Sequence, residues 1–283
     1  MTDFFLVGAP KAGTTSLYDY LSQHPNIFVP AVKEPNFYIE VGPQSRNVIN
    51  ILDKVVYEKL YRDAKIEQLK GDFSVSYLHG EDTSRRIYEE NPSAKIIMVI
   101  RNPVNRAFSH WLMDIREGFT KDDFIKAFNN DVSYTGKRGF CYNSMYYDCG
   151  LYGDAIEKYQ SYFKDVLVLV YEDLFTDVAK QISKIYDFLD IEDITSNSFS
   201  KKNVSGVVRN PVMAQFYHNT TVRLILKYIV PKEFKDTLRS FITSKNEQKI
   251  TNEEYKLIYS FFEDDIKKVR QLVKNPELWK KEL

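Results

Sequence analysis

The chain has 283 residues, in which 39 lysines plus arginines balance 39 aspartates plus glutamates. This length suits one large α/β domain, and a hydrophobic content of 43% is typical of a folded protein. Zero net charge excludes a general attraction to nucleic acid or anionic membranes, so any anion site must be local. The two cysteines, Cys141 and Cys149, form no metal motif and no disulfide framework, and we expect no metal site. Without a signal peptide or an apolar run of spanning length, we expect a cytoplasmic protein with no transmembrane segment.

The first predicted element is a buried strand over residues 3–7, followed by the loop GAPKAG and a helix. Two glycines and a proline within six residues favour a tight turn. Hydroxyl side chains at the helix start lie where free N–H groups and the helix dipole attract anions. These hydroxyls belong to Thr14, Thr15 and Ser16. With the positive charge of Lys11 added, the stretch predicts a phosphate-binding loop.

The loop differs from the Walker A pattern in the position of its lysine. Gly8 and Gly13 have the Walker spacing, but Thr14 stands where that pattern has its lysine, and Lys11 lies inside the loop instead. A cation there could approach a bridging or terminal phosphate oxygen from the loop side. The alternative is an ordinary strand-to-helix turn with a solvated lysine. The agreement of loop, cation and hydroxyls favours the phosphate site.

Further along the chain, apolar runs alternate with helical patterns. Buried strands are expected to end at residues 71–74 and to cover residues 94–100 and 166–171. Helices are expected over residues 14–22, 53–64, 83–90, 103–116, 121–128, 152–163 and 179–189, with a short extended piece at 26–30 and a polar loop at 191–210. This alternation predicts an α/β fold, with a P-loop-like central parallel sheet flanked by helices.

We predict a single domain over residues 1–283. Residues 1–211 would form the α/β core that binds the ligand, and residues 212–283 a mainly helical C-terminal extension of the same domain. Neither the oligomeric state nor the roles of this extension and of the irregular segment 131–150 can be inferred from the sequence.

Charged side chains follow several of the predicted strands. Lys11, Asp72, Arg101 and Glu172 each come just after a strand, and parallel sheets bind ligands beyond the carboxyl ends of their strands. We therefore expect these side chains to converge. Arg101 offers a planar fork for phosphate oxygens, and Ser109, eight residues later, could grip the same phosphate from another side. The alternative is a salt-bridged arginine and a surface serine.

A possible acceptor segment, Lys33-Glu34-Pro35, precedes the aromatic pair Phe37-Tyr38, which could wall a pocket. A glutamate near a group-transfer centre can accept a proton from an alcohol, and general-base action supplies roughly 10²- to 10⁴-fold. Asp72 is a second carboxylate candidate. The alternative for the Lys-Glu pair is a solvated surface position.

These motifs together resemble a known enzyme family. FFLVGAPKAGTTSLYDYL resembles the 5′-phosphosulfate loop of sulfotransferases that use 3′-phosphoadenylyl sulfate (PAPS), and VIRNPVNRAFSHW resembles their 3′-phosphate segment. KEPNFY and GDFSVSYL are similar to segments of bacterial carbohydrate sulfotransferases and heparan sulfate sulfotransferases. VLVLVYEDL resembles their late strand, and NVSGVVRNP resembles the late basic loop that closes over the cofactor. The matches follow the family's order from residue 3 to residue 211.

The resemblance implies a role for each matching residue. Lys11 would contact the sulfate-bearing phosphate and stabilise the leaving group, and Glu34 would be the acceptor base, with Asp72 as the other candidate. The 3′-phosphate would be bound by Arg101, Ser109 and Arg209. The 5′-phosphate would be held by Lys11, Ala12, Gly13, Thr14, Thr15 and Ser16, and the acceptor by Lys33, Glu34, Phe37 and Tyr38.

The implied reaction transfers the sulfuryl group of PAPS to a hydroxyl of a carbohydrate, polysaccharide or glycolipid, and releases adenosine 3′,5′-bisphosphate (PAP). The chain departs from the family pattern where Asp72 replaces a glutamate, Phe73 stands where heparan sulfate enzymes often have lysine, and Val207-Val208 precede Arg209. Two alternatives are a P-loop kinase or NTPase, and a non-catalytic binding protein with a vestigial cofactor site. No motif identifies the acceptor or the sulfated position.

Overall fold

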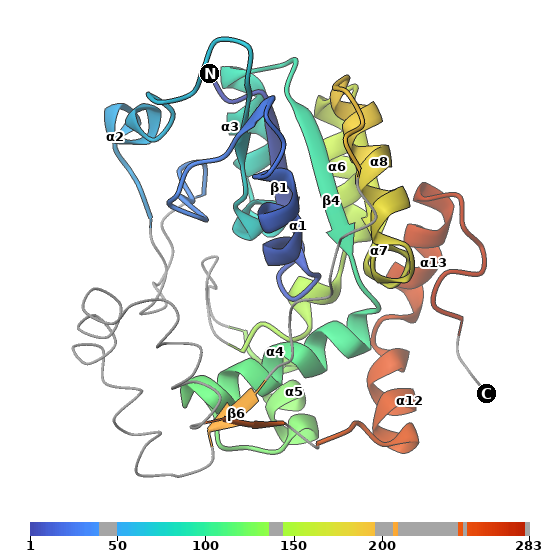
Figure 1. Ribbon diagram of the computed structural model, residues 1–283. Coiled ribbons are helices and arrows are strands. Elements are labelled where there is room, and N and C mark those ends of the chain that lie inside the picture. Colours follow the sequence, from blue (N-terminus) through green and yellow to red (C-terminus); the bar gives the residue numbers. More distant parts are fainter. Residues whose placement is uncertain (40–49, 136–143, 196–205, 209–242, 246–247, 281–283) are drawn as a thin grey trace.

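The computed structural model describes residues 1–39, 50–135, 144–195, 206–208, 243–245 and 248–280. A central sheet is flanked by helices, and helix α4 (Pro103–Glu117) crosses below the end of strand β4 (Lys95–Ile100) (Figure 1). These elements place the beginning of α4 next to the carboxyl end of the sheet. The predicted α/β class is confirmed.

The sheet has five parallel strands in the order β2-β3-β1-β4-β5. The remaining strands are β1 (Phe4–Gly8), β2 (Ile27–Phe28), β3 (Leu69–Asp72) and β5 (Val166–Val170). All of β1 and five of the six residues of β4 are buried. Such continuous apolar runs form strands because helices cover both faces of a parallel sheet.

Most predicted helices lie where the sequence places them. The helices of the described residues are α1 (Thr14–Leu21), α2 (Lys54–Lys59), α3 (Thr83–Glu90), α4, α5 (Phe124–Val132), α6 (Gly153–Tyr162), α7 (Tyr171–Thr176), α8 (Val178–Leu189), α12 (Asn252–Ser260) and α13 (Glu263–Leu272), with 3₁₀ turns at Val75–His79 and Asp148–Gly150. Helix α5 begins later than predicted because the Asp123 side chain caps it, accepting from the Lys126 amide. Helix α7 was not predicted, since it follows β5 without an intervening loop.

Within the predicted loop at residues 191–210, three of the described residues form a strand. Strand β6 (Gly206–Val208) pairs antiparallel with β7 (Thr243–Lys245). Local sequence does not reveal this pair, because its partners are far apart along the chain. Helices α12 and α13 agree with a helical C-terminal region, while the predicted breaks near Pro231 and Asn246 lie outside the described residues. The division of the domain at residue 211 remains a prediction.

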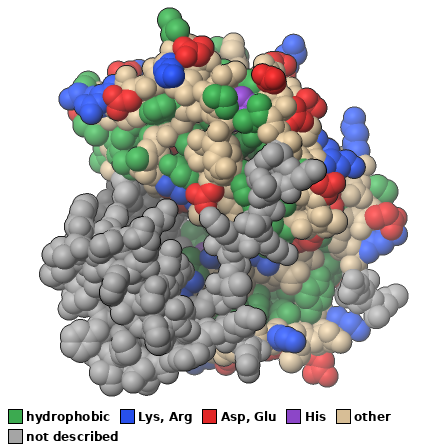
Figure 2. Space-filling view, in the orientation of Figure 1, with side chains coloured by type: hydrophobic (Ala, Val, Ile, Leu, Met, Phe, Trp, Pro, Cys, Tyr) green, Lys and Arg blue, Asp and Glu red, His purple; other side chains and the backbone are tan. Residues whose placement is uncertain are grey.

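The buried side chains form two clusters. One surrounds the sheet, and the second joins α4 and α5 to α12 and α13 through residues such as Trp111, Phe128, Ile258 and Phe262. The C-terminal helices therefore pack onto the helix that carries Ser109. Acidic and basic side chains are interspersed over the described surface in Figure 2, in keeping with the balanced composition. Among the described residues, none of the helices has the length and apolarity to cross a membrane.

The contact between β1 and β3 gives a prediction about stability. Gly71 pairs with Phe4, and a Cβ on Gly71 would lie 2.3 Å from the buried Phe4 ring. We expect Gly71→Ala to lower the free energy of unfolding by about 1–3 kcal/mol, the usual cost of overpacking a core. Urea denaturation would measure it, with Lys59→Ala on the exposed face of α2 as the control. An unchanged midpoint for Gly71→Ala would contradict this packing.

Candidate functional site

The loop between β1 and α1 is built around Gly13, which has a φ of 80°. A Cβ at this position would lie 2.7 Å from the Phe175 ring and 3.2 Å from the Tyr171 ring, both on α7. Glycine is therefore required by its conformation and by the close approach of α7. No side chain caps this helix start, and the Ser16 amide donates to the Gly13 carbonyl oxygen at 3.0 Å, so the amides before Ser16 are the ones placed to meet an anion.

The other predicted loop residues surround this helix start. Ala12, Thr14 and Ser16 are buried, whereas Thr15 is exposed and accepts a hydrogen bond from Lys33 Nζ at 2.6 Å. The structure thus joins the predicted acceptor segment directly to the loop. A single lysine side chain makes this connection, over a separation of 18 residues in sequence.

Lys11 lies within a group of positive charges. Burial, together with the charges of three arginines, lowers the pKa of Lys11 to about 8. These arginines are Arg116, Arg101 and Arg106. The Lys11 Nζ is 3.6 Å from Sδ of Met113 on α4. Bringing these cations together is unfavourable without a partner of opposite charge, and a bound anion relieves the repulsion.

Arg101 is held beside the loop by contacts to its neighbours. It donates to the Lys11 carbonyl oxygen at 2.9 Å, and its guanidinium carbon lies 4.3 Å from the centre of the Tyr171 ring. Its Nε is buried and has no hydrogen-bond partner among the residues that the structure describes. Such donors are costly to bury unpaired, so the arrangement fits a ligand oxygen at this position. Ser109 is partly buried on α4, two turns further along the chain.

Glu34 lies next to these groups. Its Oε1 is 3.6 Å from Lys33 Nζ, and its side chain is 35% exposed. Burial raises the pKa of Glu34, while the charges of Lys33 and Lys11 oppose this shift. The φ of 56° at Glu34 is unusual for a residue with a side chain. A partly accessible carboxylate with a raised pKa, close to a cation, is suited to accepting a proton.

Asp72, the other predicted base, lies in a different environment. Its side chain is fully buried and accepts hydrogen bonds from Tyr57 at 2.8 Å, Ser74 at 2.7 Å and Tyr77 at 3.0 Å. Burial raises the pKa of Asp72 to about 6, although the three hydroxyl donors favour the charged form. This placement does not support proton transfer with an external acceptor. It indicates that Asp72 anchors the end of β3 to the surrounding rings.

The predicted aromatic wall also belongs largely to the core. Tyr38 is buried, with its ring 5.6 Å from that of Phe5, and Phe37 stacks on Tyr57 at 4.4 Å. Their placement supports packing and does not support the predicted acceptor contacts. Lys33 and Glu34 are the two predicted acceptor residues that the structure brings to the loop. Arg209 lies outside the described residues.

Arg116 and Met113 were not among the predicted site residues. They share one face of α4 with Ser109, because Met113 follows it by four residues and Arg116 by seven. This helical periodicity could have found them. Arg106 was interpreted as structural, and it is fully buried and donates to the His110 ring and to the Met145 carbonyl oxygen. Its charge nevertheless also acts on Lys11.

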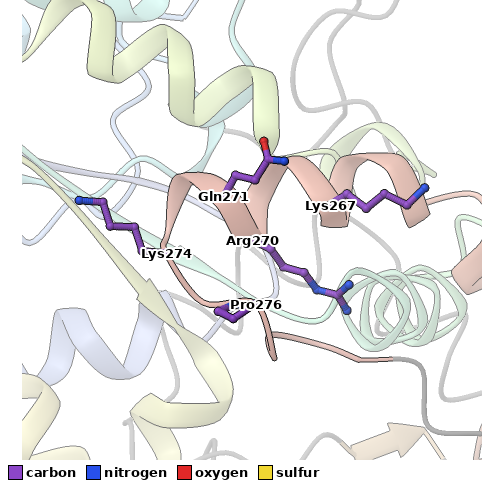
Figure 3. Close-up of a pocket in the computed structure, with 5 residues that line it drawn as sticks. All are labelled: Lys267, Arg270, Gln271, Lys274 and Pro276. Atoms are coloured by element: carbon purple, nitrogen blue, oxygen red, sulfur yellow. The ribbon is translucent and has the colours of Figure 1, made fainter.

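A pocket elsewhere on the surface contains none of these residues. It is lined by Lys267, Arg270, Gln271, Lys274 and Pro276. In Figure 3 the side chains of Lys267 and Lys274 project away from each other, so the two amines do not converge on one point. This pocket therefore offers no second anion site.

A parallel sheet with a cationic, glycine-dependent loop after its central strand defines an anion-binding α/β domain of the P-loop type. The sulfotransferase domain family matches residues 1–270 of the chain. The chain belongs to this family, and the prediction of a sulfotransferase domain is confirmed.

Curated relatives of the chain include two sulfotransferases whose names specify carbohydrate substrates. Human carbohydrate sulfotransferase 15 is 24% identical over 265 residues, which covers 74% of this chain and 47% of that protein. Mouse heparan sulfate glucosamine 3-O-sulfotransferase 6 is 26% identical over 206 residues, covering 68% of this chain and 53% of that protein. The chain thus spans about half the length of the curated relatives it matches.

Solved structures with the same fold include a sulfotransferase from Alicyclobacillus acidocaldarius. It has a TM-score of 0.72 at 24% identity and covers 97% of this chain and 96% of its own. Mouse sulfotransferase SULT7A1 complexed with PAP has a TM-score of 0.50 at 18% identity, covering 97% of this chain and 89% of its own. These likenesses support the fold.

The environment of Asp72 predicts a pH dependence of stability. Folding raises the pKa of this carboxyl from 3.8 to about 6, so the folded state binds the proton more tightly than the unfolded state. The resulting stabilisation is fully present below pH 3.8 and is lost as the pH rises through 6. We expect the stability of the wild type relative to Asp72→Asn to fall by roughly 2 kcal/mol between pH 4 and pH 7. Urea denaturation of both proteins across this range would measure it. A difference that does not change with pH would show that folding does not raise the pKa of this carboxyl.

Proposed function

We propose that the chain transfers the sulfuryl group of PAPS to a hydroxyl of a carbohydrate-containing acceptor. The observation that carries this proposal is the position of Lys11 inside the loop, partly buried and close to arginines, with a pKa lowered to about 8. The PAP complex of a structural neighbour supports the donor, and the names of the curated relatives support the acceptor class. Membership of the sulfotransferase family argues against the alternative of a P-loop kinase.

The residues of this site fit a nucleotide that carries phosphates on both sides of its ribose. The amides and hydroxyls from Gly13 to Ser16 would hold the 5′-phosphate. Arg101, with its unpaired Nε, and Ser109 would bind the 3′-phosphate. Arg209 is a further proposed contact from the late loop. Bound PAPS would supply the sulfuryl group, whose bond to the 5′-phosphate oxygen breaks as the acceptor oxygen bonds to sulfur.

Glu34 would act as the general base. Its carboxylate takes the proton of the acceptor hydroxyl, and its partial exposure leaves a path for that hydroxyl. Lys33 orients this carboxylate and also contacts Thr15, so base and loop are held together. Asp72 supports the region without touching the acceptor, because hydroxyl groups of the protein already surround it.

Lys11 would stabilise the leaving group. A pKa of about 8 leaves its amine mainly protonated at neutral pH, and negative charge that builds on the phosphate oxygen favours the proton further. A cation already in place at that oxygen acts without reorganisation. The cytoplasmic location and the independence of metal remain predictions from the sequence.

The proposal predicts that Lys11→Ala loses turnover. Removing one such stabilising donor typically costs about 10²- to 10³-fold in kcat. Transfer of label from PAPS to a panel of carbohydrate acceptors would measure this. Lys126→Ala, which changes an exposed amine on α5, is the control. Normal PAPS-dependent activity of Lys11→Ala would overturn the site.

The two carboxylates are predicted to differ in their effect on activity. We expect Glu34→Gln to lower kcat at least 10²-fold with little change in PAP affinity, because it loses the proton acceptor. Asp72→Asn should change thermal stability while a folded sample keeps kcat within about threefold. The same label-transfer assay and a thermal melt would test this. The opposite pattern would make Asp72 the base.

A non-catalytic binding protein remains the second candidate. It would bind PAP, measured by calorimetry, yet sulfate none of the acceptors in a broad screen. The intact set of Lys11, Arg101 and Ser109 favours the enzyme. Locating the sulfate on the product would then identify the acceptor position.

A further inference from the structure

Glu172, the second residue of α7, joins the C-terminal segment to the turn that begins α4. Its Oε1 accepts the backbone N–H of Asn102 at 3.0 Å, and its Oε2 accepts the indole N–H of Trp279 at 3.0 Å. The residue before Glu172 is Tyr171, whose ring lies under the Arg101 guanidinium. Both ends of this carboxylate are therefore used to connect a distant tryptophan with the proposed 3′-phosphate site.

The peptide group between Arg101 and Asn102 is fixed at both of its polar atoms. Its N–H is bound by Glu172, and its carbonyl oxygen accepts a hydrogen bond from the Tyr152 hydroxyl at 2.9 Å. Trp279 contacts both of these partners, through the bond to Glu172 and through its ring, which lies 5.9 Å from that of Tyr152. A single side chain thus supports the two groups that set the direction of the Arg101 backbone.

Trp279 is itself held by the C-terminal helices. Its carbonyl oxygen accepts a hydrogen bond from Tyr259 on α12 at 2.7 Å. The preceding residue, Leu278, is buried, and its carbonyl oxygen accepts from Arg270 on α13 at 2.7 Å. The indole also packs against both hydrophobic clusters. These contacts make Trp279 a rigid support.

We propose that Trp279 is a positioning residue for recognition of the 3′-phosphate, acting through Glu172 and Tyr152 on Arg101. This inference rests on the proposed function, since it takes Arg101 as a 3′-phosphate contact. These contacts fix the orientation of the Arg101 backbone and therefore the direction in which its side chain extends. Without the indole N–H, Glu172 loses one of its two hydrogen-bond donors and holds the Asn102 amide less firmly. The Arg101 guanidinium is then oriented less accurately toward the 3′-phosphate.

The test compares PAP with AMP, which lacks the 3′-phosphate, by calorimetry on the full chain. We expect Trp279→Phe, which keeps an aromatic ring, to raise the Kd for PAP about tenfold, as loss of one hydrogen bond does. The Kd for AMP should stay within about twofold. Glu172→Gln should reproduce the effect, and the double variant should show less than the sum of both.

Trp111→Phe is the matched control, because its indole donates to the Asp122 carbonyl oxygen at 3.0 Å and supports a different part of the second cluster. It should leave the ratio of the two dissociation constants unchanged. Equal weakening of PAP and AMP by Trp279→Phe would show a purely structural role and overturn the inference, as would no change for either ligand. If the wild type binds PAP no more tightly than AMP, the proposed function fails as well.

Discussion

The site depends on the mutual repulsion of cations that are partly or fully buried. Lys11 lies in the loop after β1, and three arginines act on its amine: Arg101 just before α4, Arg106 in its first turns and Arg116 near its end. Folding must hold these groups together against both burial and like charge. An anion is the partner that turns this unfavourable arrangement into a binding site. Because Lys11 lies within the loop rather than after it, its charge is close to the proposed site of the phosphate oxygen that leaves the sulfuryl group.

The C-terminal helices take part in this arrangement although they contribute no charge to Lys11. They pack onto α4 through the second hydrophobic cluster and hold Trp279 against Glu172. The turn before α4 is therefore positioned from two sides, by the sheet and by the end of the described chain. A region that looks like an appendage in sequence is part of the support for the proposed cofactor site.

The two candidate bases, Glu34 and Asp72, show what local sequence can predict about a site and what it cannot. Glu34 and Asp72 both follow recognisable segments, and each was a candidate base. Burial separates them: Asp72 is enclosed by three hydroxyl groups, whereas Glu34 stays partly exposed beside Lys33. The residues that enclose Asp72 include Tyr57, which comes from another element. No window of sequence around Asp72 contains that information.

The sequence by itself determined the parallel α/β fold, the loop and the family. It could do so because apolar runs, glycines and the order of the motifs are local properties of the chain. The tertiary structure decided which candidates share one environment. It joined Lys33 to Thr15, placed Arg116 near Lys11, packed Phe37 against the core and Tyr38 within it, and connected Trp279 to the turn at Arg101. These relations depend on packing between elements that are distant along the chain, and burial and charge act through space.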